Sequence, residues 1–237
     1  MKKTVFLSLL SILVIGCKGD DEVTIQYGPL IHYTFDGDFT NLADGKNNGV
    51  QTGGVTFVED RKGSPKSAVH LDGIDDYITF KNPLRENGNA FSISLWIRNG
   101  EIFNGNQVVV LRGATVTGIR ASKQDSITSS ICFDNYIGSG WRMVCHDIPY
   151  EGWFHVVGIY QRHEKGKLYI NGVLANQDTK VPSTDVSKDF RLDSHLGAII
   201  RKHVTGDPNT FWNGQIDDFR MYERALTNDE VSELYNE

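Results

Sequence analysis

Two cysteines in the middle of the chain, Cys132 and Cys145, have a spacing that suits oxidation to a disulfide. Between them lies Gly138-Ser139, a pair typical of the two-residue turn of a β-hairpin. That turn would place Cys132 directly opposite Cys145, and opposed β-carbons lie about 4.5–5.5 Å apart, near the separation that a disulfide requires. We therefore predict a cross-strand disulfide, with two free and packed thiols as the alternative.

The same hairpin would gather aromatic and polar side chains near its tip. Its register pairs Tyr136 with Trp141 and places Arg142 beside them. Sugar rings bind against aromatic faces, and polar groups fix their orientation. We therefore name Tyr136, Trp141 and Arg142 as candidate ligand-binding residues, with a structural role as the alternative.

A second candidate ligand site lies late in the chain. A polar stretch from Arg201 to Asn209 is typical of a loop at the rim of a domain, and two aromatic residues follow it. We name Arg201, His203 and Trp212 as candidate ligand-binding residues. For Trp212, an anchoring role in the core is an equally good interpretation.

The acidic residues and the overall charge limit the possible functions. Asp72, Asp75 and Asp76 form an acidic cluster, which we interpret as a turn because Asp before Gly is common turn chemistry. The chain has a net charge of −6 and no basic run, so it is a poor nucleic-acid binder. Neither a Gly-x-Ser-x-Gly nor a His-Glu-x-x-His motif is present.

The amino terminus has the pattern of an export signal. Two lysines precede an apolar run that ends at Gly16 and is too short to span a bilayer. The run and Cys17 resemble the lipobox of bacterial lipoproteins, which implies cleavage before Cys17 and lipid on its thiol. An ordinary cleaved signal is the alternative. We expect residues 1–16 to be a lipoprotein signal peptide.

An acidic segment follows the lipidation site. Residues 17–28 include Asp20-Asp21-Glu22 and form an acidic tether. The cluster resembles the surface-export tag of some Gram-negative outer-membrane lipoproteins, and a solvated charged linker is the alternative. We therefore expect a lipid anchor in the bacterial outer membrane, with the domain at the cell surface.

The elements that would position these residues are mostly strands. Residues 91–98 alternate apolar and polar side chains, and Asn171-Gly172 between two short apolar runs is a strong hairpin signal. Many short strands separated by turns indicate a sandwich or barrel. Thr227 and Glu230 fit the capping box of a short C-terminal helix.

Several segments resemble, in order, the laminin-G-like, concanavalin A-like lectin/glucanase superfamily. They are residues 71–78, 91–96, 153–158, 168–172 and 214–227. The resemblance implies that residues 29–237 form an all-β, concanavalin A-like jelly-roll sandwich of two antiparallel sheets with a short C-terminal helix.

The resemblance also implies a structural Ca²⁺ between an early loop and the last strand. Calcium requires six to eight oxygen ligands. Asp217 matches the position on the last strand, and the early loop offers further oxygen donors. The candidate metal ligands are Asp36, Asp38, Asp44, Asn47 and Asp217. Ordinary Asp-Gly turns are the alternative.

The family includes both hydrolases and binding modules. Laminarinase-type hydrolases of this fold carry Glu-x-Asp-x-Glu or Glu-x-Asp-x-x-Glu, but no Glu in this chain is followed by Asp two residues later. The sequence therefore predicts a non-catalytic carbohydrate-binding module on a surface-exposed lipoprotein, serving polysaccharide capture. An adhesion module with a protein partner is the alternative, and a glycoside hydrolase is the less favoured one.

Overall fold

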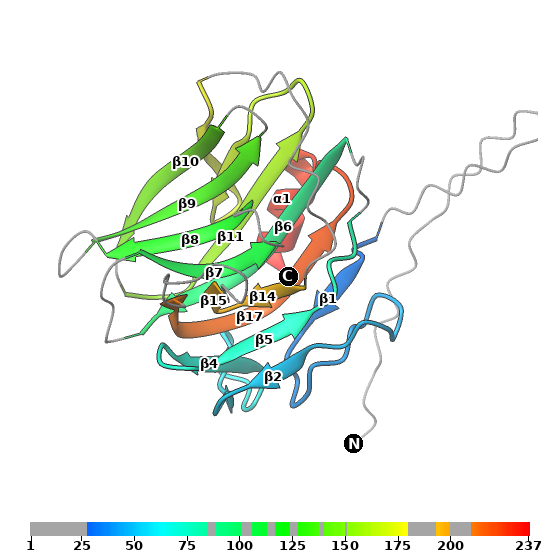
Figure 1. The fold of residues 1–237 in the computed structure, drawn as a ribbon, viewed down its shortest axis with the longest axis vertical. Coiled ribbons are helices and arrows are strands. Elements are labelled where there is room, and N and C mark those ends of the chain that lie inside the picture. The colour runs from blue at the N-terminus through cyan, green and yellow to red at the C-terminus, as the bar shows by residue number, and fades with distance from the viewer. Residues whose placement is uncertain are drawn as a thin grey trace, which may run out of the picture.

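The computed structural model describes residues 28–84, 89–100, 106–112, 117–123, 128–137, 140–149, 151–179, 193–199 and 210–237. They form a β-sandwich of two antiparallel sheets with one C-terminal helix, as the sequence predicted (Figure 1). Cys17 and the tether up to residue 27 lie outside the described residues. No helix in the described ranges has the length and apolar character needed to cross a membrane.

The first sheet has eight strands in the order β13-β12-β11-β6-β17-β4-β3, and β1 also pairs with β17. Their bounds are β1 Ile31–Tyr33, β3 Thr56–Val58, β4 Ala68–Asp72, β6 Ala90–Asn99, β11 Phe154–Gln161, β12 Lys167–Ile170, β13 Val173–Gln177 and β17 Asn213–Tyr222. The two longest neighbours, β6 and β17, form the centre of this sheet.

The second sheet has seven strands in the order β10-β9-β8-β7-β14-β5-β2. Their bounds are β2 Val50–Thr52, β5 Tyr77–Phe80, β7 Asn106–Arg112, β8 Thr117–Lys123, β9 Thr128–Ile137, β10 Gly140–Pro149 and β14 Ser194–Leu196. A small additional sheet joins β15 (Ala198–Ile199) to β16 (Thr210–Phe211). In Figure 1 the second sheet lies in front of the first.

The main core lies between the two sheets. On the central strands alternate side chains point into it, as the period of two in β-strands requires. Phe91, Ile93, Leu95 and Ile97 of β6 are buried there, and Phe133 of β9 enters from the facing sheet. Such apolar burial is the main favourable contribution to folding.

The helix α1, Asn228–Asn236, covers the outside of the first sheet, behind β6 in the view of Figure 1. Val231 and Leu234 of the helix pack with Tyr169 and Tyr222 in a second apolar cluster. The predicted capping box is confirmed: Thr227 accepts a hydrogen bond from the Glu230 backbone NH at 3.2 Å. Because both faces of β6 are covered, its residues from Phe91 to Ile97 are all buried.

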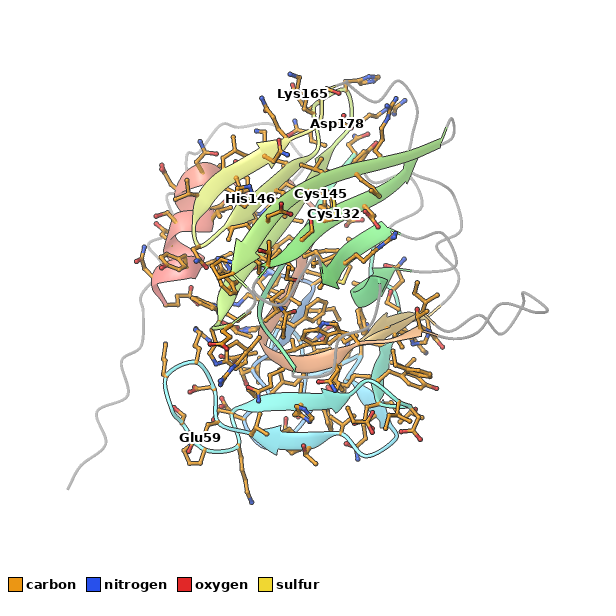
Figure 2. All side chains as sticks on the ribbon, turned by 90° about the vertical axis from the view of Figure 1, so that its left-hand side faces the viewer. Glu59, Cys132, Cys145, His146, Lys165 and Asp178 are labelled. Carbon is orange, nitrogen blue, oxygen red and sulfur yellow. A yellow bond between two sulfur atoms is a disulfide. The ribbon has the colours of Figure 1, made fainter. Side chains whose placement is uncertain are left out.

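Both predicted hairpins are confirmed. The β9–β10 register pairs Trp141 with Tyr136 and Cys132 with Cys145, and the two cysteines form the predicted disulfide (Figure 2). In the β12–β13 hairpin, Asn171 and Gly172 have φ angles of 51° and 78°, which are the positive values that a type I′ turn requires.

Candidate functional site

The outer face of the seven-stranded sheet carries a group of half-buried aromatic and polar side chains. On β5, Ile78 and Phe80 face the core, so Tyr77 and Thr79 point outward. On β14, His195 lies between the buried Ser194 and Leu196 and also points outward. Because β14 pairs directly with β5, these residues meet on one surface.

We call Tyr77, Thr79, His195 and Phe211 the aromatic patch. The centroids of the Tyr77 and His195 rings are 5.5 Å apart at an interplanar angle of 85°. The Phe211 ring lies 6.2 Å from the Tyr77 ring, and Thr79 Oγ1 lies 3.1 Å from His195 Nδ1. The patch therefore combines aromatic surface with hydroxyl and imidazole groups, the chemistry that sugar recognition uses.

An ion pair occupies another part of the same outer face. Arg120 of β8 and Asp134 of β9 alternate with core residues such as Ile119 and Phe133, and they form a salt bridge beside Cys132. Burial raises the pKa of Asp134 to about 6, although Arg120 acts in the opposite direction. The positive charge of Arg120 is therefore compensated within the protein.

A charged hollow lies on the other sheet. It has a volume of about 250 Å³, and its lining includes Asp36, Asp60, Arg61, Lys62, Asp217, Asp218 and Arg220. Arg61 Nη1 lies 2.5 Å from Asp217 Oδ2. His32 Nε2 and Arg220 Nε lie 2.8 Å and 3.1 Å from Asp218 Oδ1.

The predicted calcium ligands do not assemble around this hollow. Asp36 and Asp217 both line it, but Asp217 is held by Arg61. Asp38 caps the Thr40 NH, and Asp44 accepts from the Lys46 NH and the Asn41 side chain. The Asn47 side-chain amide donates to the Lys81 carbonyl and accepts from the Lys81 NH. This geometry does not fit the predicted calcium set.

The acidic cluster at Asp72, Asp75 and Asp76 has the geometry of a turn, in agreement with its interpretation from the sequence. Its carboxylate oxygens approach within 4.8 Å of one another. Asp72 Oδ1 accepts from the Ile74 NH at 2.7 Å, and Asp76 Oδ2 accepts from the Asp72 NH at 3.1 Å. These backbone bonds account for the carboxylates of Asp72 and Asp76.

The predicted ligand-binding residues have different outcomes. Trp212 is fully buried in the main core, so the ligand-binding prediction for it is wrong and its alternative, a core anchor, is confirmed. Arg142 is half-buried and shares the strand alternation of Val144, which faces the core, so it does not belong to the outer face. Arg201 and His203 lie outside the described residues, and for Tyr136 and Trp141 the structure gives only their backbone pairing.

Sequence reasoning missed the aromatic patch. The alternation in residues 77–80 could have placed Tyr77 and Thr79 on one face of a strand. No local pattern distinguishes His195 or Phe211, because the pairing of distant strands brings them to Tyr77.

Comparison with known proteins gives one family match. Residues 72–232 match the model of the concanavalin A-like lectin/glucanases superfamily. The chain is 32% identical over 155 residues to a botulinum-like toxin of Enterococcus sp. (strain 3G1_DIV0629), covering 61% of this chain and 12% of the toxin. It is 36% identical over 84 residues to the human adhesion G-protein coupled receptor D1, covering 35% of this chain and 9% of the receptor. The chain thus spans a small part of either protein.

Solved structures share the fold. Domain 4 of AbnA, an extracellular arabinanase of Geobacillus stearothermophilus, in complex with arabinotriose, has a TM-score of 0.62 and 22% identity, covering 88% of this chain and 98% of that domain. The binding domain of botulinum neurotoxin DC in complex with SialylT has a TM-score of 0.65 and 15% identity, covering 88% of this chain and 51% of that one.

Proposed function

The chain belongs to the concanavalin A-like lectin/glucanase superfamily, and on this basis we propose that it is a non-catalytic carbohydrate-binding module of a lipid-anchored surface protein. The superfamily holds both binding and catalytic proteins, so the fold alone does not decide between them. The choice depends on the chemistry of the residues on its surface.

The aromatic patch is the observation that carries this proposal. Tyr77 and His195 lie on the outer face of the seven-stranded sheet, and Phe211 of the small β15–β16 sheet lies beside Tyr77. Each of the three rings is half-buried and so held in place while still accessible. A sugar ring can pack against such a surface, with Thr79 and His195 as hydrogen-bonding partners for its hydroxyls. Rigid aromatic groups lose little conformational entropy when a ligand binds.

The comparisons support the same class of ligand. Domain 4 of the arabinanase was solved with arabinotriose, and this chain aligns with nearly all of that domain. The botulinum neurotoxin type C protein with a similar fold is described as depending on two ganglioside molecules for cell entry. The arabinanase domain is the more informative, because the alignment covers only about half of the toxin binding domains.

The two described carboxyl groups whose pKa is raised to about 6 do not support a hydrolase site. Burial raises the pKa of Asp134 and of Asp217 to about 6 in each case. However, the two residues lie on different sheets, and each is paired with an arginine. Glycoside hydrolases need two carboxyl groups facing one another about 5–10 Å apart across the bond to be cleaved.

A glycan array tests the proposal. The chain from Val23 onward is applied to a panel that includes arabino-oligosaccharides and sialylated oligosaccharides, with Tyr77→Ala and Trp141→Ala as variants. We expect binding to at least one class of oligosaccharide and weaker binding by Tyr77→Ala. If no glycan binds, a protein partner becomes the better proposal. The exposed Val173 and Leu174 on the edge strand β13 are then the first surface to examine.

A further inference from the structure

The side chain of Arg61 lies at the junction between the loop after β3 and the last strand. Its Nη1 is 2.5 Å from Asp217 Oδ2, and its Nη2 is 3.6 Å from Asp218 Oδ2. Its guanidinium carbon lies 4.7 Å from the centre of the Trp96 ring. Because the side chains of Arg61 and Asp217 are only 11% and 4% exposed, this is a buried ion pair.

A β-bulge in β17 directs two successive carboxylates to this point. The register against β6 shifts between Asp217, which pairs with Trp96, and Arg220, which pairs with Ser94. Asp218 has a φ of 50°, and the next residue, Phe219, is buried in the core. The extra residue lets Asp217 and Asp218 face outward together, whereas regular alternation would direct one of them into the core.

Two adjacent carboxylates removed from water require a positive partner. Burial raises the pKa of Asp217 to about 6, and Arg61 is the main group that opposes this shift. Burial alone would also raise the pKa of the neighbouring Asp218. The pKa of Asp218 is nevertheless lowered, because His32, Arg220 and Arg61 together outweigh burial. With Asp217 and Asp218 only 4% and 12% exposed, the pair of carboxylates needs a cation beside it, and the contacts of Arg61 with both provide one.

We propose that Arg61 supplies, from within the chain, the positive charge that a calcium ion would otherwise supply between the early loops and the last strand. The fold of this domain is then independent of calcium. A guanidinium is suited to this role, because its planar fork can contact both carboxylates and its face can stack on Trp96.

The position that a divalent ion would need beside Asp217 is taken by the Arg61 guanidinium. Calcium would need six to eight oxygen ligands at 2.3–2.6 Å. An ion at Asp217 would have to displace Arg61, whose guanidinium already occupies the position beside this carboxylate. The other acidic residues of the hollow, Asp36, Asp60, Asp218 and Glu237, share it with Lys62 and Arg220. Of the four early-loop residues that the sequence suggested as ligands, only Asp36 reaches this hollow.

Thermal unfolding of the purified protein in excess EDTA and in millimolar calcium is the first test. We expect the same melting temperature in both conditions. A melting temperature that falls in EDTA and recovers with calcium would overturn the proposal. This part of the test uses the unmodified protein and does not depend on any variant folding.

Removing the charge of Arg61 is the second test. Arg61→Met keeps most of the side-chain length over Trp96 but leaves Asp217 buried without its partner. We expect its melting temperature to fall by roughly 10 °C, and calcium to restore part of the loss. Adding Asp217→Asn to Arg61→Met should also restore part of it, because no unpaired charge remains. Arg61→Lys, which keeps the charge, is the matched control and should lose less.

Two results with the variant would contradict the proposal. If Arg61→Met melts at the same temperature as the unmodified protein, the guanidinium does not stabilise the junction. If Arg61→Met is destabilised but calcium does not raise its melting temperature, the two carboxylates are not a cation site, and Arg61 does not stand in for an ion.

Discussion

The rings of His195 and Tyr77 lie nearly perpendicular to one another, with their centroids 5.5 Å apart. The two residues are more than a hundred positions apart in the chain, and the pairing of β14 with β5 brings them together. Edge-to-face contacts of this kind contribute about 0.5–1.5 kcal/mol beyond the burial of their area. The patch is therefore an organised surface before any ligand binds.

Replacing the central ring of the patch should weaken glycan binding without unfolding the domain. For Tyr77→Ala we expect the dissociation constant to rise by roughly tenfold, because an aromatic contact worth about 1.4 kcal/mol is lost. Isothermal titration calorimetry measures the change. Tyr235→Ala is the matched control, since it removes the same group from the helix on the opposite side of the first sheet. Equal affinities for Tyr77→Ala and the unmodified protein would exclude the patch as the binding surface.

The disulfide should stabilise the β9–β10 hairpin. Cys132 and Cys145 are separated by 13 positions in the sequence, and a closed loop of about 15 residues corresponds to about 3 kcal/mol in the chain-entropy estimate. The double variant Cys132→Ala/Cys145→Ala should therefore unfold at a lower urea concentration. Reduction of the unmodified protein should have a similar effect. If neither treatment moves the midpoint of urea unfolding, the bridge does not contribute to stability.

His155 should make the fold sensitive to acid. It is 1% exposed, and its Nε2 lies 2.9 Å from Ser94 Oγ. Burial is the main cause that lowers its pKa from 6.5 to about 3, with Arg61 and Arg220 acting in the same direction and Asp218 against them. The imidazole of His155 is therefore protonated below about pH 6.5 in the unfolded chain, but only below about pH 3 in the folded protein.

The stability that the neutral imidazole contributes is complete above pH 6.5 and is lost as the pH falls toward 3. His155→Gln lacks this titration. We expect the free energy of unfolding of His155→Gln to be lower than that of the unmodified protein, and the difference to shrink as the pH falls from 6.5 toward 3. Urea unfolding at several pH values measures this difference. Asp134 and Asp217 titrate in both proteins, so their effects cancel in the difference. If the difference in the free energy of unfolding stays constant with pH, the pKa of His155 is the same in the folded and unfolded states.

Cys17 should carry the membrane anchor. If the amino terminus is processed as its resemblance to a lipobox implies, radiolabelled palmitate should enter the protein in cells, and the product should partition into detergent. Cys17→Ser should abolish both effects. Label retained by Cys17→Ser would place the lipid elsewhere, and an unlabelled native protein would favour an ordinary cleaved signal.

Local patterns predicted the strongest elements correctly. The alternation in residues 91–98, the Asn171-Gly172 turn and the capping box at Thr227 all correspond to observed structure. They succeed because each depends on neighbours in the sequence. The disulfide was predictable for the same reason, since one turn fixed the register of its whole hairpin.

Features that depend on tertiary pairing were not predictable. The short strands β2 and β14 have three residues each and take their pairing from β5. All three side chains of β2 are exposed, so no buried apolar position marks it as a strand. The pairing of Arg61 with Asp217 was not predictable for a similar reason, because nothing near Asp217 in the sequence indicates that Arg61 reaches it from 156 residues away.

The most direct test of carbohydrate binding is an NMR titration of the domain with an oligosaccharide that binds on the glycan array. We predict that backbone shifts concentrate at residues 77–79 and 194–196, on the outer face of the seven-stranded sheet. Residues around Trp96 and Tyr235 on the helix side should stay unchanged. Shifts confined to the helix side, or no saturable shifts with any oligosaccharide of the panel, would contradict the account.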